Sequence, residues 1–597
     1  MICTVTKPLL AGACAAALLT ATPAVSQTIY PIDRADVLIG QKFDLKVEFP
    51  GIADPAKAKI TINGKDHAAL FGKAATFVRT EVGVDASALL LREVTLDQPG
   101  AYTVTATDGV NTSTVTWTAY ATGPRRARNV ILIIGDGMGI AHRTAARIMS
   151  KGIKEGKYYG KLAMDDMPHM ALIGTSGVDS VVTDSANSAH AYSTGHKSNI
   201  SALGVYVDRT PDNYDDPKVE HLAEFVKRRK QMAVGIVTDA DLPDATPAGM
   251  VAHIAKRQDS QIAIDMLYAL KPEVMMGGGA AYFLPKSPNG IGKRTDGKDY
   301  VAQARSDGYQ VATTATEMAT AAGDPRTKTL LGLYNKRFMD GHLDRAILKP
   351  SYIQEYPEQP DLPDMAKAGL DVLSRHPNGF FLMIEAGLID KYSHVLDGER
   401  AVYDTIMLDK TVRLVKEFAE KRGDTLVLVT PDHTHAISLV GTVDDNSPVA
   451  SPEMRERIGV YGAAGYPNYV DADGDGYPDR PDPSKRLYMT FGLYPDHYET
   501  FRPKLDGMFT PAVMDPATQK YVANEAYKDV PGAVLMPGNI PRDEPNAPHV
   551  AHDVLLTAMG PGSARVHGFM DNTEVFRTMA EALGLGHQPA RRRKAAQ

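Results

Sequence analysis

The amino-acid sequence predicts an α/β protein: a doubly wound, mainly parallel sheet flanked by helices and preceded by a small immunoglobulin-like β-sandwich. Continuous apolar runs at 129–134, 232–237, 380–384 and 425–429 are typical of strands buried on both faces. Helical patterns lie between these runs, and this alternation is typical of a doubly wound sheet. From residue 28 to 122, apolar residues instead recur with period two, which predicts the sandwich.

Further segments extend both patterns. Helical periodicity predicts helices over 219–229, 247–256, 401–418 and 573–583. One last strand-like run covers 554–559. Another strand-like run ends at Val182, just before Ser185 and an expected helix. Within the sandwich, the segment from Asp97 to Tyr102 resembles the corner of immunoglobulin-like domains, where a tyrosine hydroxyl ties down a turn.

Composition bounds the class of protein. A chain of 597 residues is long for one domain, so two or more units are expected. Residues 1–26 carry one lysine, a short apolar stretch and a small-residue cleavage site, which predicts an export signal and a periplasmic or secreted product. Cys3 and Cys14 lie inside this signal, so the mature chain would have no disulfide. Loss of Lys7 takes the net charge from −7 to −8, which argues against nucleic-acid binding, and no second run is apolar enough to span a membrane.

Acids, histidines and one threonine follow the predicted strands. They are Asp136, Asp244, Thr246, Glu385, Asp390, His394, Asp432 and His433, and His549 and His552 precede the last strand. In a doubly wound sheet the ligand site lies beyond the carboxyl ends of the strands. Acids gathered there would repel one another without cations. Imidazole with carboxylate suits zinc, and hydroxyl with carboxylate oxygens suits magnesium. Ser185 would be an exposed nucleophile beside this edge or only a helix cap.

Six motifs make the chain from about 129 to 585 resemble the alkaline phosphatase family. They occur in the family's order: NVILIIGDGMG, VTDSANSAHAYSTG, DATPAGMVAHIAKR, FFLMIEAGLIDKYSH, LVLVTPDHTH and PHVAHDV. The resemblance implies an α/β phosphatase domain at 127–585. Between about 440 and 548 the alternation of strand and helix patterns lapses, which indicates an insertion, and residues 586–597 read as a basic tail. The resemblance also implies hydrolysis of small phosphate monoesters, and it makes a homodimer an expectation.

The resemblance implies a role for each site residue. Ser185 would be the nucleophile that becomes phosphorylated, Arg257 on a following helix would grip the phosphate, and Lys391 would reach it through a water. Asp184 would orient Arg257. One Zn²⁺ would be held by Asp390, His394 and His549, and a second Zn²⁺ by Asp136, Asp432 and His433. One Mg²⁺ would be held by Asp136, Thr246 and Glu385, with Asp244 as an outer acid. No role carries over to His552.

The insertion contains an acidic loop. Acids stand at loop positions 1, 3, 5, 9 and 12, which are Asp471, Asp473, Asp475, Asp479 and Asp482, with glycine at position 6. This spacing matches a calcium-binding loop, although its last ligand is normally the longer glutamate. A structural Ca²⁺ and a merely solvated acidic turn both remain open.

Three functions fit the sequence. The leading one is an exported metal-dependent phosphomonoesterase that works through a phosphoserine intermediate at alkaline pH. A phosphodiesterase or related hydrolase of the same superfamily is the alternative, although Arg257 and the magnesium ligands favour the monoester. A binding or adhesion protein with an inactive phosphatase domain is the third, and the complete ligand set speaks against it.

Overall fold

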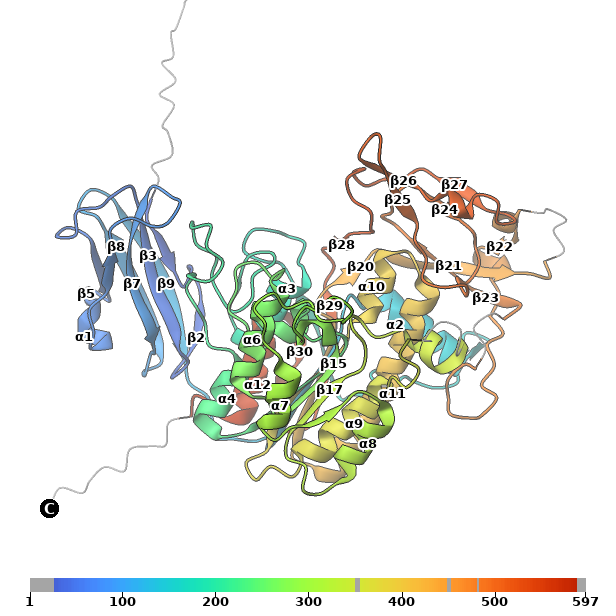
Figure 1. Cartoon of the computed structure of the whole chain (residues 1–597), viewed down its shortest axis with the longest axis horizontal. Helices are drawn as coiled ribbons and strands as arrows, with labels where there is room; N and C mark the ends of the chain where they lie inside the picture. The colour runs from blue at the N-terminus through green and yellow to red at the C-terminus, as the bar shows by residue number, and fades with distance from the viewer. Residues whose placement is uncertain (1–25, 349–354, 448–452, 480–482, 588–597) are drawn as a thin grey trace, which may run out of the picture.

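The computed structural model describes residues 26–348, 355–447, 453–479 and 483–587. The predicted signal peptide before residue 26, Asp482 and all but the first two residues of the predicted basic tail lie outside these residues. Figure 1 shows a blue N-terminal β-structure, a central sheet with helices on both faces, and an orange to red region beyond one end of that sheet. No helix among the described residues is both long and apolar enough to cross a membrane.

The N-terminal part consists of two small sheets around one core. The first runs β1 (Thr28–Tyr30), β3 (Phe43–Pro50), β7 (Ala86–Val94), β6 (Thr76–Val78), and the second β2 (Asp36–Leu38), β9 (Thr112–Tyr120), β8 (Gly100–Thr107), β4 (Lys59–Ile62), β5 (Lys65–Asp66). Trp117 is fully buried and meets the Phe43 ring edge-on at 5.6 Å between centroids. The Tyr102 hydroxyl donates to the Gln98 carbonyl at 2.8 Å, so the expected tyrosine corner is present.

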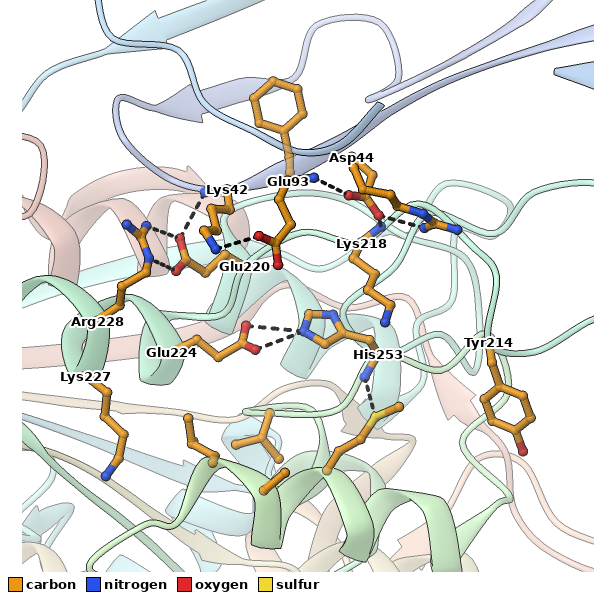
Figure 2. A pocket seen from close by; sticks show the side chains of 16 residues that line it. Lys42, Asp44, Glu93, Tyr214, Lys218, Glu220, Glu224, Lys227, Arg228 and His253 are labelled. Atoms are coloured by element: carbon orange, nitrogen blue, oxygen red, sulfur yellow. Dashed lines mark hydrogen bonds and ion pairs between the residues drawn. The ribbon is translucent and has the colours of Figure 1, made fainter. Parts of the chain in front are cut away.

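Direct contacts fix these two sheets to the rest of the chain. The buried Gln41 amide donates to the carbonyls of Thr194 (2.8 Å) and Glu220 (2.9 Å). The Lys42 backbone donates to the Glu220 carboxylate at 2.9 Å, and Lys218 donates in the same way to Asp44 (Figure 2). Because buried polar groups cross this boundary, the N-terminal sheets form part of one packed body.

A ten-stranded sheet forms the centre of the molecule. Its order is β16 (Gln310–Ala312), β17 (Leu330–Leu333), β15 (Val274–Gly278), β14 (Ala233–Asp241), β18 (Phe380–Ala386), β10 (Asn129–Gly135), β19 (Thr425–Thr430), β29 (Val554–Met559), β13 (His169–Gly174), β30 (His567–Asp571). Only β29 runs antiparallel to its neighbours within this sheet. Strand β10 pairs in parallel with β18 and β19. The predicted fold class is confirmed.

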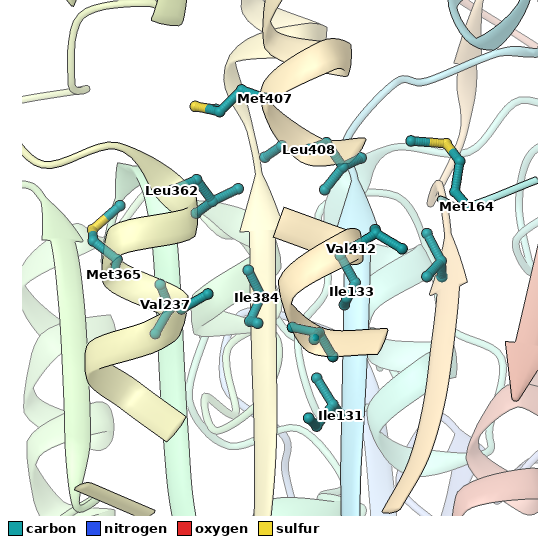
Figure 3. Packing of buried hydrophobic residues seen from close by; sticks show 14 of the residues in the cluster. Ile131, Ile133, Met164, Val237, Leu362, Met365, Ile384, Met407, Leu408 and Val412 are labelled. Carbon is teal, nitrogen blue, oxygen red and sulfur yellow. The ribbon is translucent and has the colours of Figure 1, made fainter. Parts of the chain in front are cut away.

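Helices cover both faces because the strands are apolar on both sides. They are α2 (Ile140–Lys151), α3 (Ser185–Thr194), α4 (Leu222–Lys230), α6 (Ser260–Leu270), α7 (Tyr300–Ser306), α8 (Ala315–Gly323), α9 (Leu362–Leu373), α10 (Leu388–His394), α11 (Gly398–Arg422) and α12 (Thr573–Leu583). Ile131 and Ile133 of β10 pack with Leu362 of α9 and Val412 of α11 (Figure 3). Val130 on the opposite face joins a second core with α3, α4, α6 and α12.

Two local predictions were wrong. No strand ends at Val182: β13 ends at Gly174 and an irregular segment leads to α3. Residues 247–256 form no long helix, because α5 covers only Ala245–Ala248. The backbone beyond it pairs elsewhere, with a bridge from Ile254 to Leu203 and a hydrogen bond from Arg257 N to the Ser201 carbonyl at 2.9 Å. Arg257 therefore lies in a turn and not on a helix. Tertiary pairing overrides the local helical periodicity there.

The insertion region forms small sheets beyond the carboxyl edge of the central sheet. Its strands are β21 (Ile437–Asp444), β22 (Ile458–Gly459), β23 (Lys485–Phe491), β24 (His497–Glu499), β25 (Ala512–Asp515), β26 (Lys520–Ala523) and β27 (Val534–Met536). Where the chain returns, β28 (His549–Val550) pairs antiparallel with β20 (Thr434–His435), and His549 stands opposite His435. This short ladder brings His549 to the site.

Candidate active site

Ser185 is the first residue of α3 and is almost fully buried. The Asp184 carboxylate caps the helix by accepting from Asn187 N at 3.0 Å, which fixes the backbone at the serine. The Ser185 Oγ atom lies 3.0 Å from His433 Nε2 and 3.5 Å from Asp136 Oδ1. The serine is thus both a helix-start residue and a hydroxyl presented to imidazole and carboxylate groups.

One group of three candidate ligand residues has the spacing of a tetrahedral metal site. His394 Nε2 lies 3.3 Å from Asp390 Oδ2 and 3.2 Å from His549 Nε2, and His549 Nε2 lies 3.3 Å from Asp390 Oδ1. Two ligands bound tetrahedrally to zinc at about 2.0 Å would be separated by about 3.3 Å. The Nδ1 atoms of the two histidines bond to the carbonyls of Ala547 and Thr183, which turns Nε2 into the site.

A second group lies beside Ser185. His433 Nε2 is 3.2 Å from Asp136 Oδ1 and 3.3 Å from Asp432 Oδ2, again the edge length of a zinc tetrahedron. Asp432 Oδ1 accepts from the backbone of Gly137 and His433. Its Oδ2 is buried and, apart from this 3.3 Å contact with His433 Nε2, has no hydrogen-bond partner among the described residues. Because buried carboxylate oxygens are rarely left unpartnered, this oxygen fits a metal ligand.

The third group contains oxygen donors only. Thr246 Oγ1 and Glu385 Oε1 are buried and lack hydrogen-bond partners in the described part of the chain. Burial, followed by the charge of Asp136, raises the pKa of Glu385 well above its usual range. Burial and the charges of Asp432 and Asp390 raise the pKa of Asp136 to about 7. These carboxylates would stay ionised only beside cations, so the donor set fits Mg²⁺.

Two cations and two acids form a chain of ion pairs. Arg257 contacts Asp184 at 3.3 Å and Asp244 at 2.8 Å, and Asp244 contacts Lys391 Nζ at 3.1 Å. Burial opposes the charge on Arg257, but Asp244 and Asp184 outweigh it and raise the arginine pKa. Burial likewise opposes the charge on Lys391, and Asp244 with Asp390 raises its pKa. Both side chains are therefore held charged beside the serine.

Comparison with known proteins agrees with this arrangement. The family model described as alkaline phosphatase matches residues 127–459, more than half of the chain. The chain belongs to the alkaline phosphatase family. It is 32% identical over 380 residues to the alkaline phosphatase of Escherichia coli (strain K12), covering 57% of this chain and 77% of that protein. The streptomycin-6-phosphate phosphatase of Streptomyces griseus is 32% identical over 362 residues, covering 53% and 76%.

A solved structure extends the similarity to the fold. The crystal structure of Thermus thermophilus alkaline phosphatase aligns with a TM-score of 0.54 and 25% identity, over 78% of this chain and 93% of that one. The chain is an enzyme of the alkaline phosphatase family with candidate metal-binding groups.

His435 of this phosphatase is a site residue to which the sequence assigned no role. Its Nε2 lies 2.7 Å from Asp390 Oδ1, and its side chain is buried. It belongs to one cluster with Asp390, His433 and His549. The signal was present in the sequence, because His435 stands two residues after His433, but its use depends on the pairing of β20 with β28. His552 is exposed; its backbone donates to the Val550 carbonyl at 2.9 Å, and its side chain has no hydrogen-bond or ion-pair partner within the part of the chain that the structure describes.

The acidic loop is only partly assembled. Asp471, Asp473 and Asp479 bring one carboxylate oxygen each within 4.8 Å of one another. Asp475 instead pairs with Lys410 at 2.9 Å, and Asp482 lies outside the described residues. Calcium binding by this loop stays a prediction.

Proposed function

We propose that the chain is an exported metal-dependent phosphomonoesterase that hydrolyses phosphate monoesters through a phosphoserine intermediate. The observation that carries the proposal is the placement of Ser185 Oγ at 3.0 Å from His433 Nε2, within a ligand group of tetrahedral spacing. The second such group is adjacent, since the His433 and His549 rings stack at 3.5 Å between centroids. Two metals about 4 Å apart can act on both oxygens of an in-line displacement.

The proposed ligands follow the three groups. One Zn²⁺ takes Asp390, His394 and His549, the other takes Asp136, Asp432 and His433, and Mg²⁺ takes Asp136, Thr246 and Glu385, with Asp244 as an outer acid. When bound, these ions supply Lewis acidity and lower the pKa of a bound hydroxyl or water. Asp244 pairs with both Arg257 and Lys391, so it keeps these two cations close together.

The chain's own residues account for the phosphoryl transfer. Ser185 gives up its hydroxyl proton to solvent water, and its Oγ forms a bond to phosphorus while the bond from phosphorus to the ester oxygen breaks on the opposite side; the departing oxygen takes up a proton from water. The planar Arg257 side chain donates to two terminal phosphate oxygens, a pairing that a lysine cannot reproduce. Lys391 adds positive charge through a water. Attack of water on phosphoserine then releases phosphate and regenerates the Ser185 hydroxyl.

The monoester is favoured over the diester by the charge at the site. A monoester dianion carries three terminal oxygens, and Arg257 with Lys391 offers charged donors to more than one of them. A diester carries only two and would place a second ester group against these cations. A relative whose name specifies a phosphate monoester, streptomycin-6-phosphate, supports the same choice.

One comparison tests the proposal. Purified chain should hydrolyse p-nitrophenyl phosphate far faster than bis(p-nitrophenyl) phosphate, and Ser185→Ala should remove most of the first activity. Metal analysis of the same sample should give two zinc ions and one magnesium ion per chain. Faster diester turnover would favour the phosphodiesterase, and a metal-free, inactive protein would favour a binding role.

Several wider features remain proposals of the same kind. We propose domains at 28–122 and 127–585, with the insertion at about 440–548, and export to the periplasm or medium after cleavage of residues 1–26. We propose a homodimer, for which exposed Met170, Leu172 and Phe569 on neighbouring strands offer an apolar face. Sedimentation would give the subunit number. Calcium titration of Asp471→Asn beside the natural chain would test the acidic loop.

A further inference from the structure

One cavity lies between the N-terminal sheets and the central domain, and Ser185 is not among its lining residues. Its volume is about 950 Å³. Strands β3 and β7 contribute one wall, α4 and the segment before it a second, and α6 with residues 251–253 a third (Figure 2). Ligand pockets commonly measure about 300–1,000 Å³ and favour such boundaries between domains. No residue proposed for the metal and phosphate site lines it.

The charges in this cavity are unequal. Each of its four carboxylates pairs with a lining cation: Asp44 with Arg92 (2.7 Å), Glu93 with Lys42 (2.7 Å), Glu220 with Arg228 (2.6 Å), Glu224 with His253 (3.2 Å). Lys227 pairs with Glu273, which does not line the cavity. Lys218 also lines the cavity, and no described carboxylate lies within ion-pair distance of its ammonium group.

His253 adds to this positive side. Its Nε2 faces both carboxylate oxygens of Glu224 at 3.2 Å, and its Nδ1 bonds to the Gly204 carbonyl at 2.8 Å. Burial opposes protonation of the ring, but Glu224 and the Gly204 carbonyl outweigh it and raise the pKa of His253. The bond from Nδ1 to the Gly204 carbonyl and the contact of Nε2 with Glu224 hold the ring in position in the wall.

The part of the lining that α6 and Val251 contribute is apolar. It consists of Val251, Met266, Ala269 and Leu270, and the last three come from the end of α6. The cavity therefore offers one cation without a carboxylate partner and, within the same lining, an uncharged surface. A wholly polar anion would leave this surface wet, and a cation would meet Lys218.

We propose that this cavity binds a small amphiphilic anion, with its charged head on Lys218 and its apolar body against Val251, Met266 and Leu270. A charge-assisted hydrogen bond to Lys218 fixes the head group. Burial of a short alkyl or aryl body against the α6 wall supplies the remaining affinity. The site does not depend on the proposed phosphatase activity, since the two share no side chain.

Calorimetry on the full, metal-loaded chain tests this site, with inorganic phosphate present to fill the proposed active site. Octanoate should bind with one site per chain, and octylammonium, of equal length and opposite charge, should not bind. Lys218→Ala should weaken octanoate binding at least about tenfold, as expected for the loss of a charged hydrogen bond. Leu270→Asp places a negative charge, of the same sign as the octanoate head group, against the alkyl chain. This variant should weaken octanoate binding by a similar factor.

Lys528→Ala is the matched control, because this exposed lysine lies in the insertion and outside the cavity. It should leave octanoate binding unchanged. The thermal midpoint of each variant shows whether binding is lost because the site has changed or because the chain has unfolded. Lys218→Arg keeps the positive charge and should keep octanoate binding. Absence of octanoate binding, equal binding of octylammonium, or wild-type affinity in Lys218→Ala would overturn the proposal.

Discussion

His435 offers the sharpest test of the candidate zinc site, through His435→Ala. The ring contacts Asp390 Oδ1 at 2.7 Å in a fully buried setting. Hydrogen bonds to charged groups contribute about 1.5–3 kcal/mol, which corresponds to about 10- to 100-fold in an equilibrium constant. Loss of an outer partner of a metal ligand typically costs a similar factor in metal affinity. We therefore expect zinc to bind about 10- to 100-fold more weakly.

A zinc chelator titrated against metal-loaded protein measures this affinity directly. Activity of His435→Ala should fall at limiting zinc and largely recover at saturating zinc, because the residue positions Asp390 and touches no substrate. His552→Ala is the control, since that side chain is exposed, and it should retain wild-type zinc affinity. Zinc affinity of His435→Ala within twofold of wild type would refute the reasoning.

Three further predictions concern other parts of the molecule. Arg257→Lys should lower kcat/KM for a phosphate monoester by about tenfold or more, because a point charge replaces a planar pair of donors; unchanged steady-state kinetics would contradict this. Burial lowers the pKa of His196 to about 3 and of His221 to about 4, from an ordinary 6.5. Between those values and pH 6.5 the unfolded chain binds more protons, so stability should fall by about 1.4 kcal/mol per pH unit for each histidine as pH drops below 6.5. Urea unfolding from pH 7.5 to 5 measures the slope, which should be shallower in His196→Gln. Lys46→Met should destabilise the chain by about 3–5 kcal/mol, because the buried ammonium pairs with Asp208 at 2.5 Å and its loss strands that carboxylate; an unchanged thermal midpoint would count against it.

Much of the fold could be predicted from local patterns. The run at 554–559 and the periodicity at 573–583 coincide with β29 and α12, because a strand buried on both faces and an amphipathic helix each leave a clear pattern. The expected helix over 247–256 failed for a physical reason. Its backbone pairs with Leu203 and Ser201, residues far away in sequence, and no local pattern encodes such pairing.

In the candidate site, too, some contacts could be predicted from sequence motifs and others depend on how distant segments pair. The sequence predicted residues that the structure brings together, such as Asp390 with His394 and Arg257 with Asp184, through motifs that resemble a known family. It did not predict the contact of His435, which depends on the register of two short strands. The cavity beside Lys218 was also invisible, since it exists only where separate segments pack against one another.

The ladder between β20 and β28 also bears on how the enzyme folds. Asp390 and His394 lie on α10, soon after β18 of the central sheet, but His549 arrives only after the chain has passed through the whole insertion. Closing so long a loop is slow, because its entropy is lost before the contact forms. A nascent chain would therefore complete its first ligand group late, after the insertion has folded. If His549 is a metal ligand as proposed, activity would appear only once synthesis and folding have reached the last strands. A chain ending before His549 would lack this proposed ligand even with a well-folded central sheet.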